Sequence, residues 1–189
     1  MRRIALAAAA MLVLLPTGAQ AAEAPDKSGK VEVGTPFTWD GEVANGLNLN
    51  YWGLLGNAAA PVFPRSTCND DVQSKCEVIL LEFSNPLTQE EIEAGKTFKN
   101  KTATVTITNY GPVPHPGSDF DLIAFESDAS GTRGTEVARD GSLDDPEEPA
   151  TEILTFPIRT TINEPSKYIL VEVVYFLVAQ SGYDGRGTF

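Results

Sequence analysis

The chain has few of the side chains on which nucleophilic and acid–base enzymes depend. It contains one histidine, His115, which lies between Pro114 and Pro116, and only two cysteines. A Ser-His-Asp or Cys-His site needs an imidazole that its surroundings hold in place. A histidine between two prolines is instead typical of a solvated loop. We therefore expect a protein that is not an enzyme.

Basic residues are also scarce. The chain has 14 lysines and arginines against 26 aspartates and glutamates, which gives a formal net charge of −12. A protein of this charge repels the phosphates of nucleic acids and the surface of anionic lipids. The composition therefore argues against nucleic acid and anionic membranes as partners and favours cations.

Only one apolar run stands out, and it lies at the start of the chain. Basic residues at Arg2 and Arg3 precede an apolar stretch over 4–15, and Ala19-Gln-Ala21 has the form of a cleavage site. This pattern predicts a signal peptide over residues 1–21, cleaved near Ala21, and a secreted protein that works outside the cell or in the periplasm. Removing 21 of 189 residues leaves 168, and losing two arginines takes the charge from −12 to −14.

No second run has the length of a membrane span. Residues 168–178 are apolar for too few positions and contain Glu172, so no membrane span is expected.

Residues 22–34 are small, charged and glycine-containing, which predicts a flexible mature N-terminus. The remaining residues, 35–189, are enough for one domain with a sizeable core.

The two cysteines, Cys68 and Cys76, are eight positions apart. In a secreted chain, an isolated pair usually forms a disulfide, and we expect these two to be bonded. The alternative is half of a metal site, which would need two further soft ligands.

Strand patterns recur through residues 35–189. In 102–108, threonines alternate with Ala103, Val105 and Ile107, which predicts one wet face and one buried face. In 168–178, the odd row that includes Val171, Val173 and Tyr175 should face the same core. Spaced strands predict an all-β, antiparallel, jelly-roll-like sandwich. The further strands are expected at 37–40, 78–83, 119–126, 152–156 and 183–189, with one short helix at a capping box, Thr88-Gln-Glu-Glu91.

The order of these segments resembles the bacterial pre-peptidase C-terminal domain. The resemblance covers about residues 35–189 and rests on Phe37-Thr-Trp39-Asp-Gly41, Thr104-Val-Thr-Ile107, Asp119-Phe-Asp-Leu122 with Ser127-Asp128, Thr151-Glu-Ile-Leu-Thr155, Tyr168-Ile-Leu-Val171 and Ser181-Gly-Tyr183. It implies a jelly-roll-like β-sandwich that accompanies secreted proteases without being catalytic, and that in some members binds calcium. No protease domain precedes the module in this sequence, and Ala124 stands where the family often has an aromatic residue.

Calcium is the most specific ligand that the sequence suggests. Asp119 and Asp121 alternate along one expected strand, and Asp128 follows at its end. Calcium takes six to eight oxygen ligands, many of them from carboxylates. We therefore expect a calcium ion near Asp119, Asp121 and Asp128, with Asp140, Asp144 and Asp145 as further candidates; the alternative is that this acidity is only solvated surface.

Two other features bear on function. Tyr51 and Trp52 lie in a long loop and are candidates for binding an extracellular protein or a polysaccharide, although a loop tryptophan that caps the core is the stronger interpretation. Glu82 and Glu172 lie inside strands, where a carboxylate pair would suit a small secreted hydrolase. We favour the simpler interpretation, in which both face solvent, and expect a monomeric, non-catalytic module with a binding or stabilising role.

Overall fold

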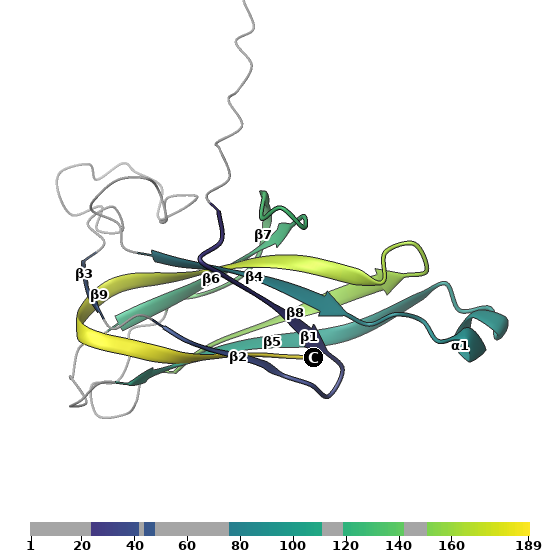
Figure 1. The fold of residues 1–189 in the computed structure, drawn as a ribbon, viewed down its shortest axis with the longest axis horizontal. Coiled ribbons are helices and arrows are strands. Elements are labelled where there is room, and N and C mark those ends of the chain that lie inside the picture. The colour runs from purple at the N-terminus through teal and green to yellow at the C-terminus, as the bar shows by residue number, and fades with distance from the viewer. Residues whose placement is uncertain (1–23, 42–43, 48–75, 111–118, 142–150) are drawn as a thin grey trace, which may run out of the picture.

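The computed structural model describes residues 24–41, 44–47, 76–110, 119–141 and 151–189. Over these residues the chain forms two β-sheets packed as a sandwich, with one short helix at one end of the molecule (Figure 1). The predicted all-β sandwich is therefore confirmed. The elements are β1 Lys27–Glu32, β2 Phe37–Asp40, β3 Ala44–Leu47, β4 Cys76–Ser84, α1 Gln89–Glu93, β5 Phe98–Tyr110, β6 Asp119–Ser127, β7 Arg133–Asp140, β8 Thr151–Thr161 and β9 Ser166–Thr188.

Each sheet is defined by its strand order. Sheet A has the order β1-β4-β9-β6-β7, and β3 pairs with β9 beyond the end of β4. Sheet B has the order β2-β9-β5-β8. All of these pairs are antiparallel except β1 with β4, which is parallel. Within the described part of the chain, no helix is long and apolar enough to cross a membrane.

The last strand belongs to both sheets. The first part of β9 pairs with β4 and β6 in sheet A, and residues 182–188 pair with β5 in sheet B. Figure 1 shows β9, in yellow, curving around one end of the sandwich between its two layers. The sequence pattern predicts two strands here, at 168–178 and 183–189, whereas the structure joins them in one strand.

The core lies between the sheets. Ala103, Val105 and Ile107 of β5 pack in one cluster with Val171, Val173 and Tyr175 of β9, as their alternation predicted. Trp39 of β2 belongs to this cluster and Phe37 packs against it. Three aromatic rings meet edge to face at one end of the core, those of Phe120, Tyr175 and Tyr183.

One prediction near the N-terminus is wrong. Residues 22–34 were expected to be flexible, but Lys27–Glu32 form β1 along the edge of sheet A. Two features hold this strand in place. Val31 is fully buried in the core, and Asp26 bonds twice to Val78: its backbone N–H donates to the carbonyl, and its side chain accepts from the N–H.

The helix forms at the predicted capping box. Thr88 Oγ1 accepts a hydrogen bond from the Glu91 N–H, and the Glu91 side chain accepts one from the Thr88 N–H. Two groups that a helix N-terminus leaves without partners are satisfied in this way. The helix ends at Glu93 with Ala94 as its C-cap, and Gly95 follows with φ 82°, a backbone conformation that favours glycine.

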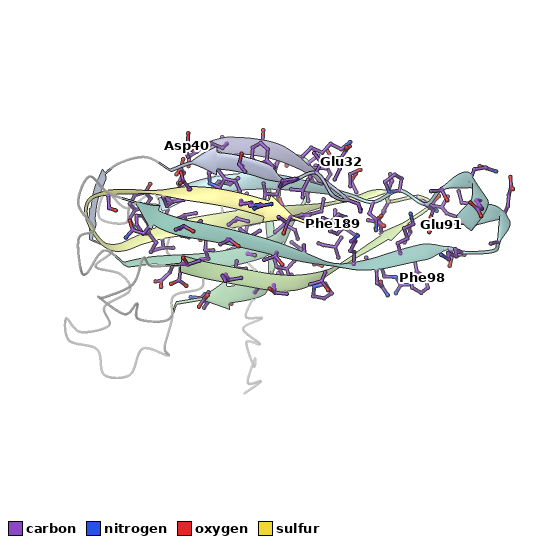
Figure 2. All side chains as sticks on the ribbon, turned by 90° about the horizontal axis from the view of Figure 1, so that it is seen from below. Glu32, Asp40, Glu91, Phe98 and Phe189 are labelled. Atoms are coloured by element: carbon purple, nitrogen blue, oxygen red, sulfur yellow. The ribbon has the colours of Figure 1, made fainter. Side chains whose placement is uncertain are left out.

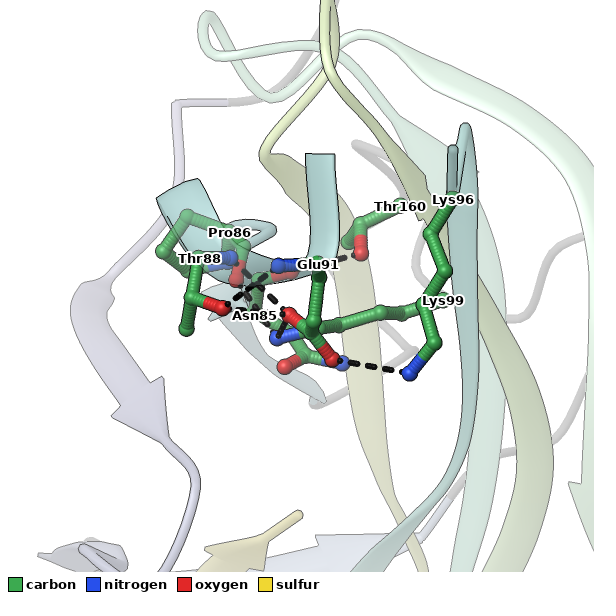
Figure 3. A network of polar contacts seen from close by, with 7 residues as sticks. All are labelled: Asn85, Pro86, Thr88, Glu91, Lys96, Lys99 and Thr160. Carbon is green, nitrogen blue, oxygen red and sulfur yellow. Dashed lines mark hydrogen bonds and ion pairs between the residues drawn. The ribbon is translucent and has the colours of Figure 1, made fainter. Parts of the chain in front are cut away.

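The connection from sheet A to sheet B is fixed by polar contacts around this helix (Figure 3). Lys99 of β5 forms an ion pair with Glu91 at 2.6 Å and donates to the carbonyl of Pro86 at 2.8 Å. Thr160 of β8 donates to the carbonyl of Asn85 at 2.7 Å. These bonds tie the crossover from β4 to β5 to the strands of sheet B.

Candidate functional site

Apart from Glu152 of β8, which is 1% exposed, the buried carboxylates of the described residues lie at two places. One is a network at the end of the core, where β1, β2, β4 and β9 meet. Glu77 of β4 accepts a hydrogen bond from the Tyr183 hydroxyl at 2.5 Å and forms an ion pair with Lys27. The Trp39 indole N–H donates to the Tyr183 oxygen at 3.3 Å.

This network links the two sheets through a buried carboxylate. Glu77 is 7% exposed and Tyr183 is fully buried, and a buried charge is stable only where partners replace its water. Gly185 and Gly41 leave room for the rings, since a Cβ at either glycine would overlap the side chain of Trp39 or Tyr183. The position of Glu77 two residues before the buried Ile79 is the sequence signal that places it on the core side.

The second place is the outer face of sheet A. Here Val78, Leu80, Ile123, Phe125, Leu170 and Val174 form an apolar cluster separate from the core. Glu172 lies on this face with no exposed surface and forms an ion pair with Arg133 of β7. Arg133 also lies over the ring of Phe125, 5.1 Å from its centroid.

The preferred interpretation of Glu172, a side chain facing solvent, is therefore wrong. Its face is the outer one, as predicted, but the centre of that face is buried. Glu82, on the same face, is only half-buried and accepts a hydrogen bond from Ser166 at 2.7 Å. The unbroken apolar run around Glu172 is the signal that both faces of the strand are covered.

The predicted calcium ligands are separated by β6. Asp121, 2% exposed, lies near the start of this strand, whereas Asp128 follows its end. Seven residues of extended chain span about 23 Å, so one ion cannot contact both side chains. Asp128 Oδ1 instead accepts hydrogen bonds from the Ser130 N–H, the Ser130 hydroxyl and the Thr132 N–H in the β6–β7 turn. The bond from the Ser130 hydroxyl contributes most to lowering the pKa of Asp128 to about 2.

Of the further candidate ligands, only Asp140 lies among the described residues, where it is paired with Leu122 across β6 and β7. The pairing of β6 with β9 shifts register between Asp119 and Phe120. Asp140 accepts a hydrogen bond from the Ile153 N–H at 3.0 Å, at the junction of β7 and β8. Among the described residues, no three acidic, histidine or cysteine side chains come together as a metal site would require. Cys68, Tyr51, Trp52, His115, Asp144 and Asp145 lie outside the described residues, so the disulfide and the loop aromatics stay predictions.

The register brings Asp121 close to Glu172. Asp121 is paired with Val174, and Glu172 is two residues from Val174 along the same face. Diagonal neighbours of this kind lie about 7–8 Å apart at Cα. The outer face of sheet A thus holds two buried carboxylates side by side, one of them paired with Arg133.

The outer face of sheet B is different. The outward residues of β5 and β8 alternate with the core residues and are exposed or half-buried. Neither strand places a lysine, aspartate or glutamate on this face; the two contribute seven threonines, at 102, 104, 106, 108, 151, 155 and 161. Ile153 lies among them with 51% of its surface exposed. We call the outward side of sheet B, with these threonines at its centre, the threonine face. It is an accessible surface that was not among the predicted sites.

No protein-family model matches the chain, and a comparison with curated proteins finds no matching relative. The resemblance to pre-peptidase C-terminal domains therefore stays a prediction beyond the two-sheet sandwich itself.

Proposed function

We propose that the chain is a secreted, non-catalytic β-sandwich that binds an extracellular partner through the threonine face of sheet B. The exposure and composition of this face carry the proposal. Surfaces that bind partners are depleted in lysine, glutamate and aspartate relative to the rest of the protein surface, and β5 and β8 have none of these on their outward side.

The stiffness of threonine supports the same function. A β-branched side chain has few rotamers, so little side-chain entropy is lost when a partner orders it. A face of lysines and glutamates would lose more, up to about 2 kcal/mol for each side chain held still. The threonine face is therefore organised before its partner arrives.

Retention on the surface of the producing cells tests this proposal. The double variant Thr106→Glu with Thr155→Glu places two charges on the face. Thr135→Glu, on exposed β7 of sheet A, is the matched control. We expect the wild type and the control to be retained in the cell-surface fraction and the double variant to be released. Equal partitioning of all three proteins would contradict the proposal.

A calcium-dependent form of this function keeps Asp119 and Asp121 as ligands and omits Asp128. Binding to the folded state alone raises stability with ligand concentration. The melting temperature should then rise with millimolar calcium and fall with chelator, and Asp119→Asn with Asp121→Asn should remove the response. Identical melting curves of the wild type in calcium and in chelator would exclude a calcium site.

One observation favours a second function, that of a hydrolase. Asp121 and Glu172 are neighbouring carboxylates whose Cα separation, about 7–8 Å, leaves room for carboxyl groups spaced as in inverting glycosidases, about 6.5–9.5 Å. Their burial argues against it, because a substrate must reach both groups. Release of reducing sugar by the wild type, and its loss in Glu172→Gln, would establish the hydrolase; a wild type without activity would exclude it.

A further inference from the structure

The register of sheet B arranges its outward side chains in rows across the strands. One row contains Thr38, Arg186, Thr106 and Ile153, from β2, β9, β5 and β8 in turn. The next row on one side contains Thr188, Thr104 and Thr155. On the other side, Asp40, Asp184, Thr108 and Thr151 form a third row. Hydroxyl groups therefore lie next to one another both along and across the strands.

Charge on this face is small and balanced. The outward side chains of the four strands include two arginines, Arg159 and Arg186, and two aspartates, Asp40 and Asp184. The whole chain, by contrast, has a net charge of −12. A strongly anionic protein repels polyanions, and a face without net charge offers them no compensating attraction.

The shape of the face is long and narrow. The eleven residues of β8 extend about 35 Å, and the four strands together are only about 14 Å across. The corresponding flat area, about 500 Å², is below the roughly 800 Å² that each partner of a stable protein complex usually buries. A linear polymer that lies along the strands needs no wider surface.

One end of the face has an aromatic ring. Arg159 lies over Phe98, with its guanidinium carbon 4.2 Å from the ring centroid, and Phe98 remains 42% exposed. Figure 2 shows Phe98 near the end of the sandwich that carries Glu91. A sugar ring at this end would meet a flat apolar edge beside a planar donor, while the threonine hydroxyls donate to and accept from hydroxyls further along the polymer.

From the rows, the balanced charge and the narrow shape, we infer that the threonine face binds a linear, uncharged polysaccharide along β5 and β8. The inference rests on the proposed binding function and names the chemical class of its ligand. Arg186, in the central row between Thr38 and Thr106, supplies a planar set of donors for neighbouring hydroxyls of the polymer.

The test uses the mature protein and purified polysaccharides. Cellulose, chitin and amylose serve as linear uncharged probes, and alginate and heparin as anionic ones. We expect at least one uncharged polymer to deplete the wild type from solution. Thr106→Glu with Thr155→Glu should reduce this binding at least tenfold, Arg186→Gln should weaken it, and Thr135→Glu should leave it unchanged. Circular dichroism and melting curves confirm that each variant is folded.

Three results would overturn the inference: binding to none of the uncharged polymers, binding only to the anionic ones, or full binding by the folded double variant. These outcomes are distinct from failure of the proposed function. If the double variant is released from producing cells while no purified uncharged polymer binds the wild type, the face still binds a partner, but the ligand is not an uncharged polysaccharide.

Discussion

The two outward faces of the sandwich differ more than the two sides of its core. On sheet A, Ile123, Val174 and Glu172 point away from the core and are nevertheless fully buried. On sheet B, the outward threonines and Ile153 are exposed or half-buried. The difference shows that the same fold can have one sheet covered on both sides and the other covered on one side only, and that the accessible face is the one on which binding should be sought.

The largest difference between the two faces should appear when the same charge is placed on each of them. Val174→Asp should prevent folding or lower stability by several kcal/mol, because the new carboxylate is buried without a partner. Thr106→Asp should change stability by about 1 kcal/mol or less, since its side chain reaches water. Urea unfolding of both variants measures the contrast. Similar midpoints would show that the outer face of sheet A is not buried.

A second experiment tests the ion pair of sheet A. Arg133→Met should lower stability by about 3 kcal/mol, because it removes a cation that is paired with the buried Glu172 carboxylate. Adding Glu172→Gln should restore part of that loss, since the buried charge is then removed as well. A double-mutant cycle by chemical denaturation gives the coupling. Additive effects of the two changes would contradict a direct interaction.

The predicted disulfide provides a third test, which concerns sheet A alone. Cys76 packs against the apolar cluster on the outer face of sheet A, so reduction should destabilise that sheet. The nine-residue loop from Cys68 to Cys76 corresponds to about 2.5 kcal/mol in the loop-entropy model. Intact mass with and without reduction establishes the bond, and melting with and without reductant measures its effect. Two alkylatable thiols in the native protein would show that the bond is absent.

The smallest effect is expected at the end of the sandwich, away from both faces. The hydrogen bond from Lys99 contributes most to lowering the pKa of Glu91 to about 2 from an ordinary value of 4.5. Because the folded pKa is the lower one, this contribution is present above about pH 4.5 and is lost as the pH falls toward 2. Glu91→Gln should therefore be less stable than the wild type at pH 7, and the difference should shrink below pH 4.5. A difference independent of pH would exclude this linkage.

Alternation made sheet B predictable from the sequence. Threonines at every second position of 102–108 correctly indicated which side of β5 is buried. Strands with long apolar runs, such as residues 78–81 of β4, have no polar row to mark a side, so the burial of Glu172 was missed. Strand β1 was not predicted either. Its pattern of glycine, lysine and valine is too short to distinguish a strand from a flexible segment. Its order depends on the parallel pairing with β4, a contact between residues about 50 positions apart.

The candidate sites could be predicted from the sequence only where they depend on a local pattern. Sequence spacing placed Asp119, Asp121 and Asp128 in one region, but an extended strand separates residues that are close in number. The Glu77–Tyr183 hydrogen bond joins residues 106 positions apart, and no local pattern relates them. The wet side of residues 102–108, by contrast, was visible as an alternation; the register that aligns β5, β8 and β9 into one threonine face was not.

The shared strand β9 also determines when the protein can fold during synthesis. Residues 182–188 lie between β2 and β5 in sheet B, so among the described residues β2 gains its partner strand only when this part of β9 has been made. Long-range pairing of this kind makes folding slow and dependent on the complete chain. Because both sheets need β9, we expect neither sheet to close before β9 has been made, and an unfolded chain is the form that can be threaded through a translocation channel. The topology therefore suits the export that residues 1–21 predict.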